Sequence, residues 1–168
     1  MLSSHSEVID QSIVLLESLN DDEYQDVCQP LFSASIGQHM RHIIDHFSSL
    51  KRGLESHQVD YNHRSRQSDT ETSLPIAISQ LQQIKAWVLS LNEAQLAKPL
   101  NVISDINVQT SHDGSVESTT ARELVFCVSH AIHHFAQVKI IRQLQGAQVD
   151  VNFGVAPATI AYQQSLQN

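Results

Sequence analysis

The chain has 168 residues, of which 41% are hydrophobic, and its eighteen Asp and Glu against ten Lys and Arg give a formal net charge of −8. This length fits a single domain over residues 1–168 with one buried core. The negative charge argues against a nucleic acid or an anionic membrane as a partner. Glycine and proline are scarce, with five and four residues, which favours a helical protein over an all-β one.

The N-terminal stretch MLSSHSEVID lacks the basic region and apolar run of a secretory signal. No segment approaches the roughly 18 uninterrupted apolar residues of a membrane span. Cys28 and Cys127 lie far apart and do not form the pattern of a disulfide framework. We therefore expect a soluble cytoplasmic protein with reduced thiols.

Hydrophobic residues recur at helical spacing first over about residues 5–19. An acidic connection follows and leads to a second predicted helix. Ser35 and Gln38 form a capping-box pattern at its start, and the helix runs to about Gly53.

A third helix is predicted to begin near Ser73, with Pro75 at a tolerated first-turn position, and to continue to about Leu91. The period then changes. Residues 100–118 are rich in Val and Ile, and Asp113-Gly114 is a turn signal, so this stretch is expected to form a small hairpin or extended excursion.

The fourth predicted helix begins with a second capping-box pattern, Thr120 with Glu123, and Gly146 is a natural residue to end it. A short helix after Pro157 is expected to pack back on the rest. Four amphipathic helices with one long excursion before the last of them predict an all-α protein, a four-helix bundle.

Histidines gather on two of these helices. In SHAIHHFAQ, His130 and His134 are one turn apart and about 40° apart around the helix axis, so both can reach one point. They fall within the apolar arc and should face the bundle interior. The second helix contributes three more histidines that share a face: His39, His42 and His46.

Helix bundles build metal sites from inward-facing side chains of this kind on adjacent helices. Neutral imidazole is the commonest metal ligand, but it is also an ordinary buried polar group. Random placement of ten histidines would give about 0.6 His-x-x-x-His pairs, against the two found here. The spacing alone therefore leaves open core or surface histidines that bind no metal.

The motifs SIGQHMRHIIDH (35–46) and SHAIHHFAQ (129–137) together resemble those of the DinB-like superfamily, also called DinB/YfiT. Its members are four-helix bundles that hold a metal with one histidine of the second helix and a His-x-x-x-His pair of the last bundle helix. Their late motif commonly reads His-x-x-His-His-x-Gly-Gln, and here Ala136 replaces the glycine. The resemblance implies that His42, His130 and His134 bind one divalent ion.

Neighbouring residues compete for these roles. His39 or His46 could act as a ligand instead of His42, whereas His133 is expected to be a flanking polar residue. Cys127 could be a soft fourth ligand, although a buried free thiol is the better interpretation. Two further side chains near the ligands could orient imidazole N–H groups, or serve capping and surface roles: Asp45 and Gln137.

Three neutral imidazoles leave a metal at least one open position, which is typical of a catalytic site. Zinc is the default, while nickel, iron and manganese also suit nitrogen ligands. The resemblance implies a transferase or isomerase that uses a low-molecular-weight thiol such as bacillithiol or mycothiol. The alternatives are a non-catalytic metal-binding stress or sensor protein and a metal-dependent hydrolase.

A basic stretch could receive the carboxylates of such a thiol, or its members could be ordinary solvated charges: Lys51, Arg52, Arg64 and Arg66. Relatives in the superfamily are often dimers, which implies a homodimer here. No nucleic-acid or membrane partner is expected, and the substrate is expected to be a small molecule.

Overall fold

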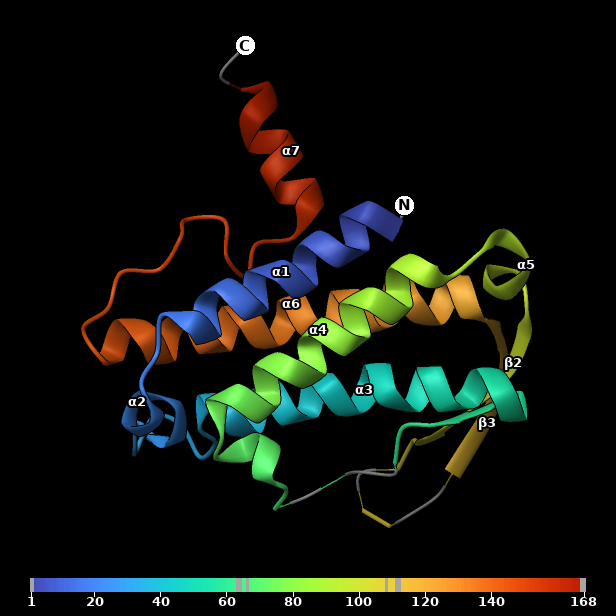
Figure 1. Cartoon of the computed structure of the whole chain (residues 1–168), viewed down its shortest axis with the longest axis horizontal. Coiled ribbons are helices and arrows are strands. Elements are labelled where there is room, and N and C mark those ends of the chain that lie inside the picture. Colours follow the sequence, from blue (N-terminus) through green and yellow to red (C-terminus); the bar gives the residue numbers. More distant parts are fainter. Residues whose placement is uncertain (1, 63–64, 66, 108, 111–112, 167–168) are drawn as a thin grey trace.

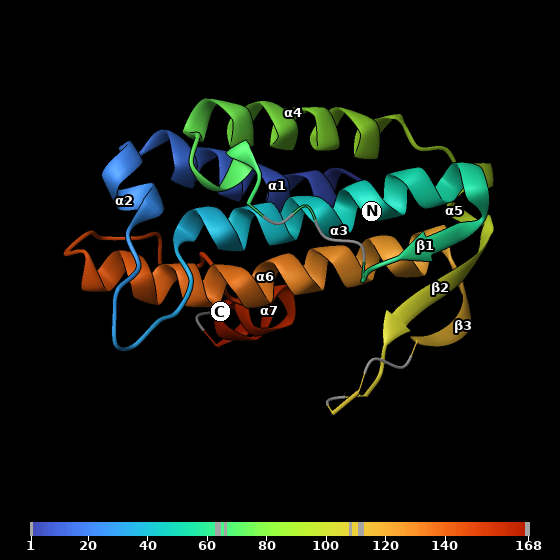
Figure 2. The ribbon, with the colours of Figure 1, turned by 90° about the horizontal axis from the view of Figure 1, so that it is seen from below.

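The computed structural model describes residues 2–62, 65, 67–107, 109–110 and 113–166. Its body is made of four long helices that lie side by side (Figure 1). The central pair is α3 and α6; α4 packs on α3, and α1 packs on both α4 and α6 (Figure 2). Their bounds are α1 (Leu2–Glu17), α3 (Ile36–Ser56), α4 (Leu74–Ser90) and α6 (Thr120–Leu144).

A small sheet packs at one end of α3, so the all-α prediction was too narrow. Its strands are β1 (Gln58–Asp60), β2 (Pro99–Asp105) and β3 (Asp113–Thr119), in the order β1-β2-β3. β1 pairs parallel with β2, and β2 pairs antiparallel with β3. The three-residue β1 was not predicted, because so short a strand carries no readable alternation.

The hairpin expected within residues 100–118 is confirmed, but its turn was misplaced. Asp113 and Gly114 lie in β3, where they pair with Asp105 and Ser104. The connection between the two strands therefore lies before Asp113, and the Asp-Gly pair begins a strand. The remaining short elements are α2 (Asp21–Gln25), the 3-10 helix η1 (Asp69–Glu71), α5 (Glu93–Leu96) and α7 (Pro157–Ser165).

The predicted start of α3 is confirmed in detail. The Gln38 backbone N–H donates to Ser35 Oγ at 3.2 Å, and the Ser35 N–H donates to Gln38 Oε1 at 3.0 Å. These bonds satisfy two backbone donors that the first turn of a helix leaves without partners. They place the start of the helix that carries three of the histidines.

The capping box predicted at the start of α6 was wrong by one residue. Thr119, not Thr120, is the cap, and it accepts the Arg122 N–H at 3.3 Å. Glu123 does not complete a box, because its carboxylate accepts hydrogen bonds from Tyr61 and Ser118. The Glu123 carboxylate therefore takes part in buried tertiary hydrogen bonds and not in a local cap of the helix.

Among the described residues, α6 is the one helix long and apolar enough to pass for a membrane span by length and composition. Its apolar side is the core of the protein. Leu124, Phe135, Val138 and Ile141 are all fully buried, and they pack among side chains of the other long helices. Core packing accounts for the buried face of α6, while Val125, Ile140 and Leu144 are exposed.

The C-terminal segment departs from the expectation. A helix does follow Pro157, but none of the side chains of α7 is buried, and its end points away from the body (Figure 1). The residue that packs back is Phe153, whose ring stacks on Phe135 with centroids 4.8 Å apart. Gly154 follows with a φ of +73° and lies directly on the α6 backbone.

Gly154→Ala should destabilise the protein more than Gly146→Ala. Both glycines have positive φ, but a Cβ at Gly154 would lie 2.6 Å from Ala136 N, whereas nothing lies within 4 Å at Gly146. Both variants incur the left-handed backbone penalty of about 1–2 kcal/mol. Only Gly154→Ala adds a steric penalty, of about 1–3 kcal/mol. Equal free energies of urea unfolding for the two variants would contradict this packing.

Candidate metal centre

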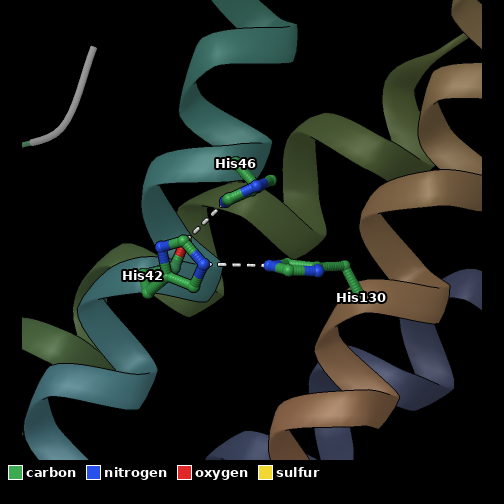
Figure 3. A group of neighbouring side chains, drawn as sticks. All are labelled: His42, His46 and His130. Carbon is green, nitrogen blue, oxygen red and sulfur yellow. Dashed lines mark hydrogen bonds between the residues drawn. The ribbon is translucent and has the colours of Figure 1, made fainter. Parts of the chain in front are cut away.

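Imidazoles from α3 and α6 meet between the two helices. His130 Nε2 lies 2.9 Å from His42 Nε2 and 3.2 Å from His134 Nε2. Figure 3 shows His42 and His130 pointing toward one another from opposing helices. The structure thus brings together the three side chains named from the sequence, and their role as ligands stays a prediction.

His46 is a fourth member of this cluster. Its ring centroid lies 4.2 Å from that of His130, and its Nδ1 lies 2.9 Å from the His42 carbonyl oxygen (Figure 3). Because a carbonyl only accepts, Nδ1 of His46 carries the proton and Nε2 remains for a metal. The ligand atoms of His42, His46 and His130 all lie within 4.8 Å of one another, so this trio could also hold an ion.

His39 contacts the side of the His134 ring that faces away from His130. The Nδ1 atoms of the two rings are 2.9 Å apart, so one must donate its proton to the other. His39 is buried, and its Nε2 has no hydrogen-bond partner among the described residues. This contact engages Nδ1 of His134 and leaves its Nε2 facing His130.

Burial and neighbouring imidazoles favour the neutral form of two of these rings, His134 and His39. Desolvation lowers the pKa of His134 to about 3, and the neighbouring imidazoles of His130 and His39 add to the effect. Burial also lowers the pKa of His39. Neutral imidazole is the form that binds metals, so at neutral pH His134 is in the protonation state that a metal ligand needs.

The two predicted orienting residues make other contacts. Asp45 accepts from Arg41 Nη1 and from the Ser65 backbone N–H, each at 3.1 Å. Gln137 Nε2 lies 3.0 Å from a ring nitrogen of His133, which is exposed as expected. His134 is instead hydrogen-bonded to His39 through the Nδ1 atoms of the two rings, and His39 was considered only as a ligand in the sequence analysis.

Cys127 is a buried thiol, in agreement with the preferred interpretation. Its Sγ lies 3.6 Å from the Tyr61 hydroxyl, and burial raises its pKa to about 12. A metal ligand is a thiolate, so the neutral thiol is better described as part of the core.

Aromatic and acidic residues beside the imidazoles were missed by the sequence analysis. Tyr61 stacks on His46 with centroids 5.1 Å apart, and its hydroxyl donates to Glu123 Oε2 at 2.9 Å. Burial raises the pKa of Tyr61. Phe126 stacks on His130 at 5.7 Å. The i, i+4 spacing of Phe126 and His130 was a readable signal, whereas nothing in the sequence links Tyr61 to Glu123.

The basic stretch is described only in part. Lys51 and Arg52 are exposed on α3, and Arg52 donates to Ser49 Oγ at 3.1 Å. Arg64 and Arg66 lie outside the described residues.

Comparison with known proteins places this geometry in context. The family model of the DinB superfamily matches residues 5–138. The solved structure of the DinB-like protein YjoA from Bacillus subtilis is similar with a TM-score of 0.59, covering 88% of this chain and 91% of that one. Its sequence identity is 19%, so this likeness shows the fold alone.

A curated relative matches over a shorter range. FK506-binding protein 5 of Rhizopus delemar is 31% identical over 104 residues, which is 62% of this chain. The match spans only 27% of that fungal protein's length.

Acidification should destabilise the metal-free protein. His134 stays neutral in the folded chain down to about pH 3, whereas in the unfolded chain it takes up a proton near the ordinary value of 6.5. The unfolded state then binds more protons, so this stability is complete above pH 6.5 and is lost as the pH falls toward 3. Urea unfolding between about pH 7.5 and about pH 4.5 measures the loss.

His134→Asn should flatten this pH dependence, and His133→Asn, which changes the exposed neighbour, should preserve it. A pH dependence that is the same in wild type and His134→Asn would contradict the buried, neutral state of His134.

Proposed function

Because this chain belongs to the DinB superfamily, we propose that it is a metal-dependent enzyme in which His42, His130 and His134 hold one divalent ion. The observation that carries the proposal is the pair of contacts made by His130 Nε2, at 2.9 Å from His42 Nε2 on the other helix and 3.2 Å from His134 Nε2 on its own helix. Two ligands of a single ion lie at comparable separations, since each zinc–nitrogen bond is about 2.0–2.1 Å long.

His134 is preferred to His46 as the third ligand. His39 engages Nδ1 of His134, which fixes the ring with Nε2 toward His130. A hydrogen bond to the far nitrogen is the usual way in which proteins orient a metal-binding imidazole. His46 is the alternative, because its own Nδ1 is similarly engaged by the His42 carbonyl oxygen.

When bound, the ion would supply a Lewis acid that lowers the pKa of a bound water or thiol. Zinc fits three imidazoles best, and nickel, iron or manganese would also accept them. The residues of the chain keep His134 neutral, engage its Nδ1 through His39, and place Phe126 and Tyr61 beside the rings.

The reaction we propose is the transfer of a low-molecular-weight thiol to an electrophile. We also propose that the protein is a homodimer and works in the cytoplasm. Three nitrogen ligands leave a position for the sulfur, and the family resemblance supports this chemistry. A hydrolase would need a general base. The nearby carboxylate of Glu123 is engaged by Tyr61 and Ser118, which disfavours that role. A non-catalytic metal sensor would share the ion and lack turnover.

Metal content should depend on three histidines. His42→Ala, His130→Ala and His134→Ala should each lower bound metal from about one ion per chain to near zero, because two imidazoles hold a divalent ion weakly. Elemental analysis of untagged protein purified without chelators measures the content.

His133→Ala is the matched control, since it removes an exposed imidazole adjacent to His134. His46→Ala tests the competing ligand. Full occupancy in His134→Ala together with an empty His46→Ala would replace His134 by His46 in the proposed site.

Thiol binding should be visible after cobalt substitution. A thiolate on cobalt gives an intense sulfur-to-metal charge-transfer band, which a bound water does not. Titration with glutathione, bacillithiol and mycothiol should produce this band with at least one of them. The metal lowers the pKa of a bound thiol, so the thiolate forms on the cobalt. Should none of them change the cobalt spectrum at millimolar concentration, the sensor or the hydrolase would replace the transferase.

A further inference from the structure

A row of contacts leads from the imidazole cluster toward the N-terminus of α6. Phe126 lies one turn before His130, and the two rings stack with an interplanar angle of 21°. Arg122 lies one turn before Phe126, with its guanidinium carbon 5.5 Å from the centroid of the Phe126 ring. The three side chains, hereafter the 122–130 row, join a candidate metal ligand to a cation through an aromatic ring.

The guanidinium at the end of this row is open to solvent. The Arg122 side chain is 66% exposed, and Nη1 donates to Glu123 Oε1 at 3.0 Å. Glu123 is itself 2% exposed and also accepts from the hydroxyls of Tyr61 and Ser118. A guanidinium has five N–H donors in a planar fork, so Arg122 keeps donors for a second anion.

The helix dipole gives no reason for a cation at this position. Arg122 is in the first turn of α6, where the dipole favours anions and disfavours cations. The ion pair with Glu123 uses one edge of the guanidinium and offsets its charge. The N–H donors that remain on the exposed side chain could bind an anionic group of a ligand.

The middle of the row is aromatic. The Phe126 ring is half-buried and lies 5.3 Å from the ring of Tyr61. The surface between the imidazoles and the guanidinium is therefore suited to an apolar segment.

On the basis of the metal centre proposed above, we propose that Arg122 binds the carboxylate of an amphiphilic substrate. The substrate's metal-binding group lies at the imidazoles and its apolar middle lies on Phe126. Eight residues of helix separate Arg122 from His130, a rise of about 12 Å, so the two polar ends are roughly 8–12 Å apart. A monoanionic carboxylate suits the site better than a phosphate dianion, because the Glu123 carboxylate lies beside the guanidinium.

The test compares two ligands on the metal-loaded, full-length protein by calorimetric titration. Para-carboxymethyl benzohydroxamate carries a chelating group, a ring and a carboxylate, and its primary carboxamide is the neutral match. Hydroxamates chelate divalent ions whatever the reaction of the protein. We expect the carboxylate to bind about tenfold more tightly than the carboxamide, as a charge-assisted hydrogen bond provides.

Arg122→Gln should remove this preference and leave the affinity for the carboxamide unchanged. Lys85→Gln is the control, because it removes a partly exposed cation of α4, a helix that carries none of the candidate ligands, and it should keep the full preference. The comparison of the two ligands on the wild-type protein needs no variant, so it stands even where Arg122→Gln folds poorly.

Equal binding of carboxylate and carboxamide to the metal-loaded wild type would overturn the role of Arg122 and leave the metal centre intact. An unchanged preference in Arg122→Gln would do the same. A protein that takes up no metal and binds neither hydroxamate would instead overturn the proposed function, and this inference with it.

Discussion

The packing of α3 against α6 is the contact on which the candidate site depends. It places imidazoles of both helices, His42 and His130, with nitrogens 2.9 Å apart. Buried polar groups cost free energy unless they are paired. Here several of the rings contact one another, and the buried Nε2 of His39 has no partner among the described residues. An ion bound at these rings only in the folded state would stabilise the fold as well as supply the chemistry.

Much of the helical framework could be predicted because its signals are local. The cap of α3 at Ser35 depends on residues three positions apart, and helical periodicity located the long helices. The predictions that failed concern features that depend on contacts between residues distant in sequence. β1 exists because it pairs parallel with β2 about forty residues later. The capping box predicted from Thr120 and Glu123 does not form, and Glu123 instead accepts a hydrogen bond from Tyr61, sixty-two positions away.

The sequence predicted which histidines come together better than it predicted what each of them contacts. Helical spacing placed His130 and His134 on one face, and the structure confirms that they meet histidines of α3. Spacing could not tell that His39 would contact Nδ1 of His134, because that contact depends on how the two helices cross. For the same reason the sequence left the role of Asp45 open between orienting an imidazole and capping or surface roles, and in the structure Asp45 bonds to Arg41 and Ser65. Arg122 was not predicted to belong to the site, because it lies two turns of helix before His130.

The measurement that tests the central claim most directly is anomalous diffraction from crystals grown with zinc, recorded on both sides of its absorption edge. The account predicts one peak between α3 and α6, about 2.0–2.1 Å from the Nε2 atoms of His42, His130 and His134, with His39 hydrogen-bonded to His134. A peak held by His46 in place of His134 would contradict the ligand assignment. Zinc-supplied crystals with no peak near these rings would contradict the metal centre itself.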